Sequence, residues 1–290
     1  MSFGDINRVN TNLQAMSSQY SLNKINSRLA DNQLKLSTGL RINKAEDDAA
    51  GFSIASKLSG RIAGLEQAQR NVGDAKSMLD IAESGFDSLM DIMVEMKSKA
   101  TQAANDSLGT TERGYLKTQI EALSEEINKI ADQTTFQGTA LMDGASLTFQ
   151  VGEGSGDTKS VSISSSRADD LFSTASGAIS AVDTDDGITL TDATRGTFNT
   201  LLGNVDTAID TLASTVNQIG IDQNSLSIRQ ENLSQAVTSN SAARSRIQDA
   251  DFAKIQSESV KMQIMQQTAT SALAQANTSP QAVLGFLGGG

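Results

Sequence analysis

The side chains that carry out most protein chemistry are absent from this sequence or stand where they cannot cooperate. The chain has no His and no Cys, which removes zinc motifs of the H-E-x-x-H type and nucleophilic triads built on His. Asp47 and Asp48 are adjacent carboxylates. Neighbours at a helix start do not face each other, so we expect these two to cap the helix and pair at the surface.

Two loop-like segments have residue types found in a calcium-binding loop and in a phosphate-binding loop, respectively. Residues 183–187 read D-T-D-D-G, but the glycine register of a calcium loop is wrong and the terminal Glu is missing. Residues 152–156 read G-E-G-S-G, which is turn material, because the helix-opening G-x-G-x-x-G pattern is not met. We therefore predict that the chain is not an enzyme and has no catalytic, cofactor-binding or metal-binding residue.

The far end of the chain is uncharged from Met262 to Gly290, although the formal net charge of the whole chain is −11. Glutamines and asparagines interrupt the apolar residues of this end, and a bilayer span needs about 20 mostly apolar residues. We predict no membrane insertion, and expect other protein chains to bury this end. No basic stripe with interleaved aromatic residues occurs, so we predict no nucleic-acid partner.

The composition indicates long packed helices. Aromatic residues make up 4% and there is one proline, so a core of Ala, Leu, Ile and Met is expected. The first residues lack a basic segment followed by an apolar run, so no cleavable secretion signal is expected.

Apolar residues between Leu58 and Ala100 recur at steps of three and four, which predicts a helix over roughly 44–106, about 90 Å long. Asn43 and Glu46 are a plausible capping pair for its start. A second helix from Thr110 to about Ala131 should run antiparallel to the first, and helical spacing returns from Phe198 to beyond Val237. The predicted rod-packing residues are Leu58, Ile62, Leu65, Val72, Leu79, Phe86, Leu89, Met93, Met96, Leu116, Ile120, Leu123, Ile127, Leu201, Val205 and Leu212.

Heptad-like steps also mark both ends of the chain. We expect these terminal seams to be contacts between subunits, because one chain offers too little surface to cover them. The predicted subunit-interface residues are Ile6, Val9, Leu13, Met16, Tyr20, Phe252, Ile255, Met262, Met265, Ala269, Ala272, Ala276, Val283, Leu284, Phe286 and Leu287.

The middle of the sequence has a different pattern. Residues 146–151 and 159–163 alternate around a glycine-rich loop, which predicts a β-hairpin over 146–163. Residues 166–189 are rich in Ser, Thr, Asp and Gly and are predicted to be a short exposed insert. The fold class is therefore mainly α: long antiparallel helical rods or a coiled coil of the N- and C-terminal segments, with a small β-hairpin and a short outer insert between them.

Several long motifs resemble those of bacterial flagellins. Residues 36–51 (LSTGLRINKAEDDAAG) are strongly similar to the N-terminal signature, and residues 242–252 (AARSRIQDADF), 271–277 and 280–287 resemble the C-terminal one. Residues 133–138 (QTTFQG) are similar to the segment before the family's hairpin. The signature residues are Gly39, Arg41, Asn43, Asp47, Asp48, Gly51, Arg246, Asp249 and Asp251.

The resemblance implies a subunit that polymerises into the extracellular flagellar filament for swimming motility. Such a subunit is exported without a cleavable signal peptide through the flagellar type III apparatus and meets a secretion chaperone, the filament cap and the hook-junction proteins. Residues 1–43 with 248–290 would form an inner terminal-helix domain with its connecting spokes. Residues 44–165 with 190–247 would form the helical rod domain, and residues 166–189 the variable insert.

The sequence departs from the family pattern at three positions, and other functions remain as alternatives. Many flagellins are recognised by a toll-like receptor through a basic and an apolar residue on the first long helix and an acidic residue on the second. The matching positions here are Glu95, Lys99 and Gln119, so recognition is predicted to be weak or absent. The alternatives are a hook–filament junction protein, a sibling with similar terminal helices, and a cytoplasmic coiled-coil scaffold.

Overall fold

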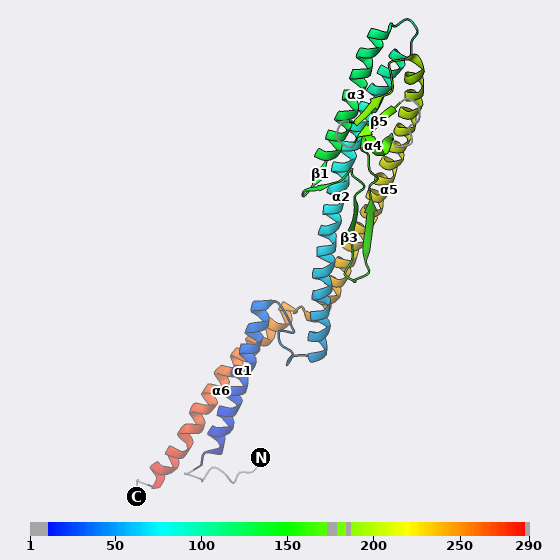
Figure 1. Cartoon of the computed structure of the whole chain (residues 1–290). Helices are drawn as coiled ribbons and strands as arrows, with labels where there is room; N and C mark the ends of the chain where they lie inside the picture. Colours follow the sequence, from blue (N-terminus) through cyan, green and yellow to red (C-terminus); the bar gives the residue numbers. More distant parts are fainter. Residues whose placement is uncertain (1–10, 173–178, 184–186, 288–290) are drawn as a thin grey trace. The chain divides into compact units, whose positions relative to one another are not determined.

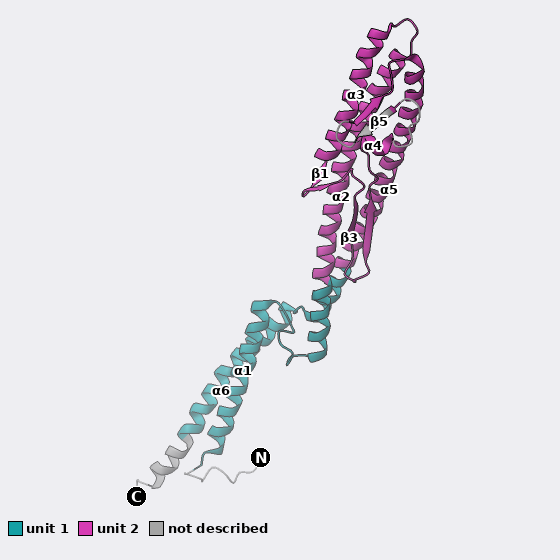
Figure 2. Cartoon of the chain, viewed as in Figure 1, with its two compact units in different colours: residues 1–61, 239–290 teal, residues 62–238 magenta. Residues whose placement is uncertain are grey.

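The computed structural model describes residues 11–172, 179–183 and 187–287. The chain divides into two compact units (Figure 2). Residues 1–61 with 239–290 are called the terminal unit, and residues 62–238 the central unit.

Helices dominate the described residues, as the composition predicts (Figure 1). The longest are α2 (Ala49–Ala103) and α5 (Arg195–Gln248), with 55 and 54 residues. At 1.5 Å per residue each is about 80 Å long. The others are α1 (Leu13–Thr38), α3 (Thr110–Gln133), the short α4 (Ala168–Leu171) and α6 (Phe252–Leu287). The predicted mainly α fold is confirmed, and the unit boundaries fall within α2 and α5.

The terminal unit contains the helix pair α1 and α6, which run antiparallel. Asn12 Nδ2 donates to Ala276 O at 2.7 Å, and Gln266 Nε2 donates to Asn26 Oδ1 at 2.7 Å, so early residues of α1 meet late residues of α6. The Asn12 side chain also accepts the Ala15 N–H at 2.9 Å, which caps the start of α1. One residue thus fixes both the helix end and the alignment of the pair.

The seam between α1 and α6 is narrow and partly polar. On α1 the less exposed residues recur at steps of three and four, and on α6 the same pattern begins at Ile255. Only Ile25, Ile255, Ser259 and Ala276 of this seam are buried. The seam residues are Ala15, Ser18, Leu22, Ile25, Leu29 and Asn32 on α1, and Ile255, Ser259, Met262, Gln266, Ala269, Leu273 and Ala276 on α6.

The central unit has a continuous apolar core between α2, α3, α5 and the strands (Figures 1 and 2). Lys97 pairs with Asp206 at 2.5 Å, and Gln223 Nε2 donates to Asp80 and Glu83, so α2 and α5 run antiparallel. Of the predicted rod-packing residues, Leu58 and Leu123 are half-buried and all the others are buried. The heptad pattern of α2 therefore forms core within this single chain.

The predicted β-hairpin is present. Strands β3 (Ser146–Gln150) and β4 (Thr158–Ser162) pair antiparallel, with Leu147 opposite Val161. Thr148 and Ser160 share a hydrogen bond on the exposed face, while Val161 is buried. Apolar and polar residues alternate between the two faces, which is the signal that made this element predictable.

The described part of residues 166–189 does not form the exposed insert that the sequence predicted. Ala168, Leu171, Phe172 and Ile188 are buried in the core of the central unit. This segment includes α4 and leads into the hairpin of β5 (Ile179–Asp183) and β6 (Gly187–Leu190); a further short hairpin joins β1 (Thr135–Phe136) to β2 (Thr139–Ala140). Its few apolar residues are spread among many polar ones, so composition concealed its burial.

Side chains of α3 satisfy backbone groups of this segment. Ser124 Oγ accepts the Ile188 N–H at 2.9 Å, and Glu121 Oε1 accepts the Leu190 N–H at 2.9 Å. Asn128 Oδ1 accepts the Ala168 N–H at 2.8 Å. At Gly187, with φ +78°, a Cβ would stand 2.4 Å from Ser124 Oγ and 2.9 Å from the Glu125 N. The turn therefore requires glycine for both its conformation and its space.

A buried ion pair holds the β3–β4 hairpin to α5. Lys159 Nζ lies 2.8 Å from Asp222 Oδ1, and the Asp222 side chain is only 5% exposed. We expect Asp222→Asn to lower the free energy of unfolding of the central unit by about 1–3 kcal/mol, because the Lys159 ammonium loses its charged partner. Urea titration followed by circular dichroism measures the change.

Asp206→Asn is the matched control. Asp206 pairs with Lys97 at a site where the two side chains are 53% and 47% exposed, so its loss should cost about 0–1 kcal/mol. Equal effects of the two substitutions would show that burial of the Lys159–Asp222 pair contributes nothing.

Candidate functional site

The described residues contain no cluster of candidate metal ligands. Within residues 11–172, 179–183 and 187–287 no three His, Cys, Asp or Glu side chains come together as metal ligands. No helix in this part of the chain combines the length and hydropathy of a membrane span. Residues 184–186 of the rejected calcium-loop segment lie outside the described residues. The candidate site is therefore a surface.

Five exposed apolar side chains on α1 and α6 form the candidate interface. On α1 the exposed fractions are 44% for Leu13, 63% for Met16 and 71% for Tyr20. On α6, Val260 is 45% and Ile264 is 59% exposed. At 100° per residue these five side chains lie about half a turn away from the α1–α6 seam. They are called the outer apolar residues.

The outer apolar residues remain exposed to solvent because each helix of a two-helix pair can cover only one stripe of the other. Each helix of the pair carries apolar residues on a second stripe, which no described residue of the chain covers. Phe252 and Met265, 56% and 40% exposed, flank the seam on α6. Exposed apolar surface of this kind is a candidate for a contact with another molecule.

The structure divides the predicted subunit-interface residues into groups. Leu13, Met16, Tyr20, Phe252 and Met265 are exposed large apolar residues, and Ala272 is exposed. Ile255 and Ala276, expected to face other chains, are instead buried within the α1–α6 pair, with Met262 and Ala269 half-buried beside them. Ile6 and Val9 lie outside the described residues, as do the side chains of Val283, Leu284, Phe286 and Leu287.

Sequence reasoning placed most of the α6 seam correctly and misplaced it at two positions, Gln266 and Leu273. Ile255, Ser259 and Met262 follow the heptad, and the next seam residue is Gln266 rather than the more apolar Met265. The sequence analysis chose the neighbouring Met265 and Ala272 instead of Gln266 and Leu273, and it did not single out Val260 and Ile264. The hydrogen bond from Gln266 to Asn26 explains why an amide occupies a seam position.

The signature residues gather where α1 ends and α6 begins. Gly39, with φ +72°, ends α1 by donating its N–H to Lys35 O at 2.9 Å. Its own carbonyl accepts the Ala250 N–H at 2.9 Å, next to an antiparallel bridge between Leu40 and Asp249. Arg41 Nη2 donates to Ile247 O at 2.7 Å. These bonds join segments more than 200 positions apart in the chain.

The remaining signature residues shape the ends of the neighbouring helices. Asp251 Oδ1 accepts the Lys254 N–H at 3.1 Å at the start of α6, and Arg246 lies exposed in the last turn of α5. Asp48 Oδ1 accepts the Gly51 N–H at 3.0 Å and caps α2. The predicted capping pair of Asn43 and Glu46 is therefore wrong. A Cβ at Gly51 would lie 2.7 Å from Ile42 Cδ1, which explains the glycine.

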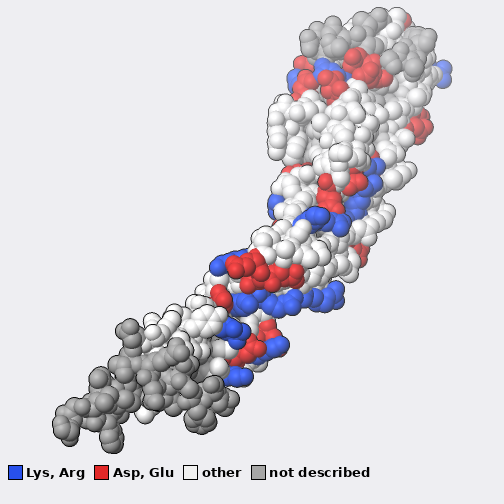
Figure 3. Space-filling model, turned by 90° about the horizontal axis from the view of Figure 1, so that it is seen from below, with Lys and Arg blue, Asp and Glu red and all other residues white. Residues whose placement is uncertain are grey.

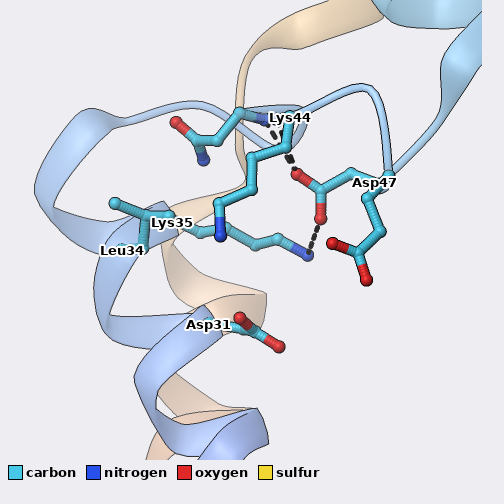
Figure 4. A pocket seen from close by; sticks show the side chains of 7 residues that line it. Asp31, Leu34, Lys35, Lys44 and Asp47 are labelled. Atoms are coloured by element: carbon cyan, nitrogen blue, oxygen red, sulfur yellow. Dashed lines mark hydrogen bonds and ion pairs between the residues drawn. The ribbon is translucent and has the colours of Figure 1, made fainter.

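Asp47 organises the turn before α2 (Figure 4). Its Oδ2 accepts the backbone N–H groups of Asn43 and Lys44, both at 3.0 Å, and Lys35 Nζ lies 3.9 Å from Oδ1. These two backbone donors, Asn43 first, together with the charges of Lys35 and Lys44, hold the pKa of the Asp47 carboxyl below its usual value. The expectation of capping and surface pairing for Asp47 and Asp48 is confirmed.

Charges are mixed on the surface (Figure 3). On the described part of the face shown, Lys and Arg side chains lie among Asp and Glu rather than in a continuous basic stripe. This distribution agrees with the absence of a nucleic-acid signature in the sequence.

Two family models match the chain. The bacterial flagellin N-terminal helical region matches residues 9–146, and the bacterial flagellin C-terminal helical region matches residues 202–287. Curated relatives include the flagellin of Bacillus subtilis (strain 168), 35% identical over 97% of this chain and 99% of the relative. The Treponema phagedenis flagellar filament 33 kDa core protein is 31% identical over 96% and 99%.

One solved structure has a related fold, and a second has a lower TM-score. A putative flagellar hook-associated protein from Vibrio parahaemolyticus has a TM-score of 0.57 at 14% identity, over 70% of this chain and all of that one. The crystal structure of Bacillus cereus flagellin has a TM-score of 0.46 at 26% identity, over 57% and 88%.

The fold defines a protein built of long helical rods. The chain belongs to the bacterial flagellin family. It is a subunit of the flagellar filament. The alternative of a hook–filament junction protein is not favoured, because the matches over nearly the whole chain are to flagellins and the hook-associated likeness concerns the fold alone.

The turn at Asp47 should respond to acid. Because its folded pKa is lowered, the stabilisation is complete above the unfolded value of about 4 and is lost as the pH falls through the folded value. We expect the amide NMR shifts of Asn43 and Lys44 to stay constant from pH 7 to about 4.5 and to move only below about pH 4. Asp47→Asn should abolish this movement, and an unchanged titration in that variant would contradict the assignment.

Proposed function

We propose that subunits assemble by covering each other's outer apolar residues on α1 and α6. The observation that supports this is the exposure of Leu13, Met16, Tyr20, Val260 and Ile264 on the face of each helix that turns away from its partner. A contact of this patch with a different patch on the next subunit is heterologous. A heterologous contact that does not close produces a helical polymer.

The α1–α6 pair has the weak internal packing that such a mechanism needs. The seam buries few side chains, and the buried Ser259 hydroxyl has no hydrogen-bond partner among the described residues. Ordering a backbone residue costs about 1–2 kcal/mol, so a two-helix pair with a thin seam gains little by itself. Neighbouring subunits that bury the outer stripes add about 25 cal/mol for each Å² of apolar surface.

The central unit supplies a different property. Its long helices share a core in which Val72, Leu79, Phe86 and Leu212 are all 0% exposed, within one chain. We infer that this unit is rigid before assembly and forms the rod layer, while the terminal unit forms the inner layer. The proposed layers are residues 44–165 with 190–247 for the rod and 1–43 with 248–290 for the interior.

The other partners follow from membership of the family. We infer export without a cleavable signal through the flagellar type III apparatus, contact with a secretion chaperone, and incorporation beneath the filament cap and beyond the hook-junction proteins. The assembled chain is then extracellular. We also infer that it has no catalytic role.

The role of the outer apolar residues is tested at Tyr20, which is 71% exposed on α1. Tyr20→Gln should raise the critical concentration for elongation of filament seeds at least about tenfold. The reason is that burial of a large apolar side chain contributes about 1.5–3 kcal/mol, and 1.4 kcal/mol is a factor of ten. Light scattering with purified monomer and sheared seeds measures it.

Tyr115→Gln is the matched control, because Tyr115 is an equally exposed aromatic residue, at 69%, on α3 of the central unit. It should leave the critical concentration within about twofold, a difference below 0.5 kcal/mol. Both monomers should keep the far-ultraviolet circular dichroism of the unchanged protein. Equal elongation by the Tyr20 variant and the unchanged protein would overturn the proposed interface.

Recognition by the toll-like receptor is proposed to be weak or absent. Glu95 and Gln119 are exposed on α2 and α3, and Lys99 is half-buried on α2. In a cell reporter assay the half-maximal dose should be at least about a hundredfold above that of a strong agonist, because mismatched charges cost several kcal/mol at an interface. The combined change Glu95→Arg, Lys99→Leu and Gln119→Glu should restore a response. A strong response of the unchanged protein at low dose would refute the proposal.

A further inference from the structure

The methionines of the chain fall into distinct environments. Of the 9 methionines, all except Met1 lie among the described residues. Two have the thioether side chain largely in solvent: Met16 on α1, 63% exposed, and Met265 on α6, 40% exposed. Met90 and Met262 are half-buried. Those buried at 0% exposure are Met78, Met93, Met96 and Met142.

The two exposed methionines share a location that the buried ones do not. Both belong to the terminal unit, and both lie outside the α1–α6 seam. Met16 is one of the outer apolar residues, between Leu13 and Tyr20 along the same face of α1. Met265 follows the exposed Ile264 in the part of α6 that has no charged residue. Met16 therefore stands on the surface proposed for assembly, and Met265 lies beside that surface on α6, where it flanks the seam.

Oxidation would change this surface without disturbing the helix pair. A peroxide transfers one oxygen atom to Sδ: its O–O bond breaks, the thioether loses two electrons, an S–O bond forms, and the peroxide leaves as water or an alcohol. The product is a polar sulfoxide that accepts hydrogen bonds but donates none. Neither side chain is buried in the α1–α6 seam, so the monomer can carry both sulfoxides and keep its fold.

We propose that Met16 and Met265 form an oxidation-sensitive site that controls whether a subunit can join a polymer. The proposal rests on the assembly interface proposed above. If the neighbouring subunit covers the sulfoxide, the polar oxygen loses its hydrogen bonds to water, which costs free energy. If the sulfoxide stays hydrated, the neighbouring subunit cannot pack closely. Both outcomes oppose assembly. Leu13, Tyr20, Val260 and Ile264 carry no thioether, so the sensitivity belongs to the two methionines. Free subunits respond to the oxidant, and assembled ones are shielded by their neighbours.

The experiment treats the full-length monomer with hydrogen peroxide and locates sulfoxides by peptide mass mapping. Met16 and Met265 should react before the four buried methionines. Peroxide is removed, and elongation of untreated seeds is measured. Oxidised monomer should need at least about tenfold more protein to elongate, and reduction by methionine sulfoxide reductases A and B should restore elongation.

Two variants separate the site from general damage. The double variant Met16→Leu with Met265→Leu should keep its elongation after the same treatment, because leucine preserves the apolar surface and resists peroxide. The matched control, Met78→Leu with Met93→Leu, should be inhibited as strongly as the unchanged protein. Equal inhibition of both double variants would overturn the proposal, as would normal elongation by monomer whose Met16 and Met265 are fully oxidised.

The same assay keeps the two proposals apart. If untreated Tyr20→Gln monomer elongates as well as the unchanged protein, the assembly interface itself is wrong. If Tyr20→Gln is impaired while oxidised monomer elongates normally, the interface stands and only the oxidation site fails. Filaments exposed to peroxide before dissociation should yield unmodified Met16 and Met265. Sulfoxide formed there as fast as in monomer would also overturn the proposal.

Discussion

A pair of helices can bury only one stripe of each helix, and this limit governs the terminal unit. Both α1 and α6 carry apolar residues on more than one stripe, so pairing always leaves apolar surface exposed. The seam that does form is narrow, and it contains Ser259 and Gln266 among its apolar residues. A stronger seam would stabilise the isolated chain and reduce what it gains from its neighbours. The polar seam weakens the isolated helix pair and the outer stripes leave apolar surface exposed, so both features favour contacts with neighbouring subunits.

The central unit, in contrast to the terminal unit, encloses its apolar core within the chain. Its apolar residues are enclosed by three long helices and by short hairpins that cover the remaining side. Side chains of α3 accept the Ile188 and Leu190 N–H groups of β6, so this strand is held against α3 although it has few large residues. The signature turn around Gly39, Asp47 and Gly51 connects consecutive helices through capping and backbone bonds. The backbone of this turn requires glycine at Gly39 and Gly51 and a carboxylate acceptor at Asp47.

The sequence predicted much of this arrangement where a single physical signal was strong. Uninterrupted three-and-four spacing located α2 and its core, and strict alternation located β3 and β4. The sequence did not predict packing that depends on hydrogen bonds of polar side chains. Gln266 occupies a seam position because it bonds to Asn26, and Ala168 and Ile188 are buried where Asn128 and Ser124 of α3 accept their backbone N–H groups. Such pairings depend on residues distant in sequence, and a single sequence carries no local sign of them.

The lack of ionisable side chains after Lys261 has a consequence for the environments this protein can tolerate. Screening by salt weakens contacts between exposed charges, and changes of acidity alter them. The later part of α6 contributes neither kind of sensitivity, since that part of the helix has nothing to screen and nothing to titrate. This stretch of α6 itself is therefore indifferent to fresh water, brine, acid and alkali, and any sensitivity of its contacts to salt or acidity comes from charged side chains elsewhere, such as Lys24, Arg28 and Asp31 of α1.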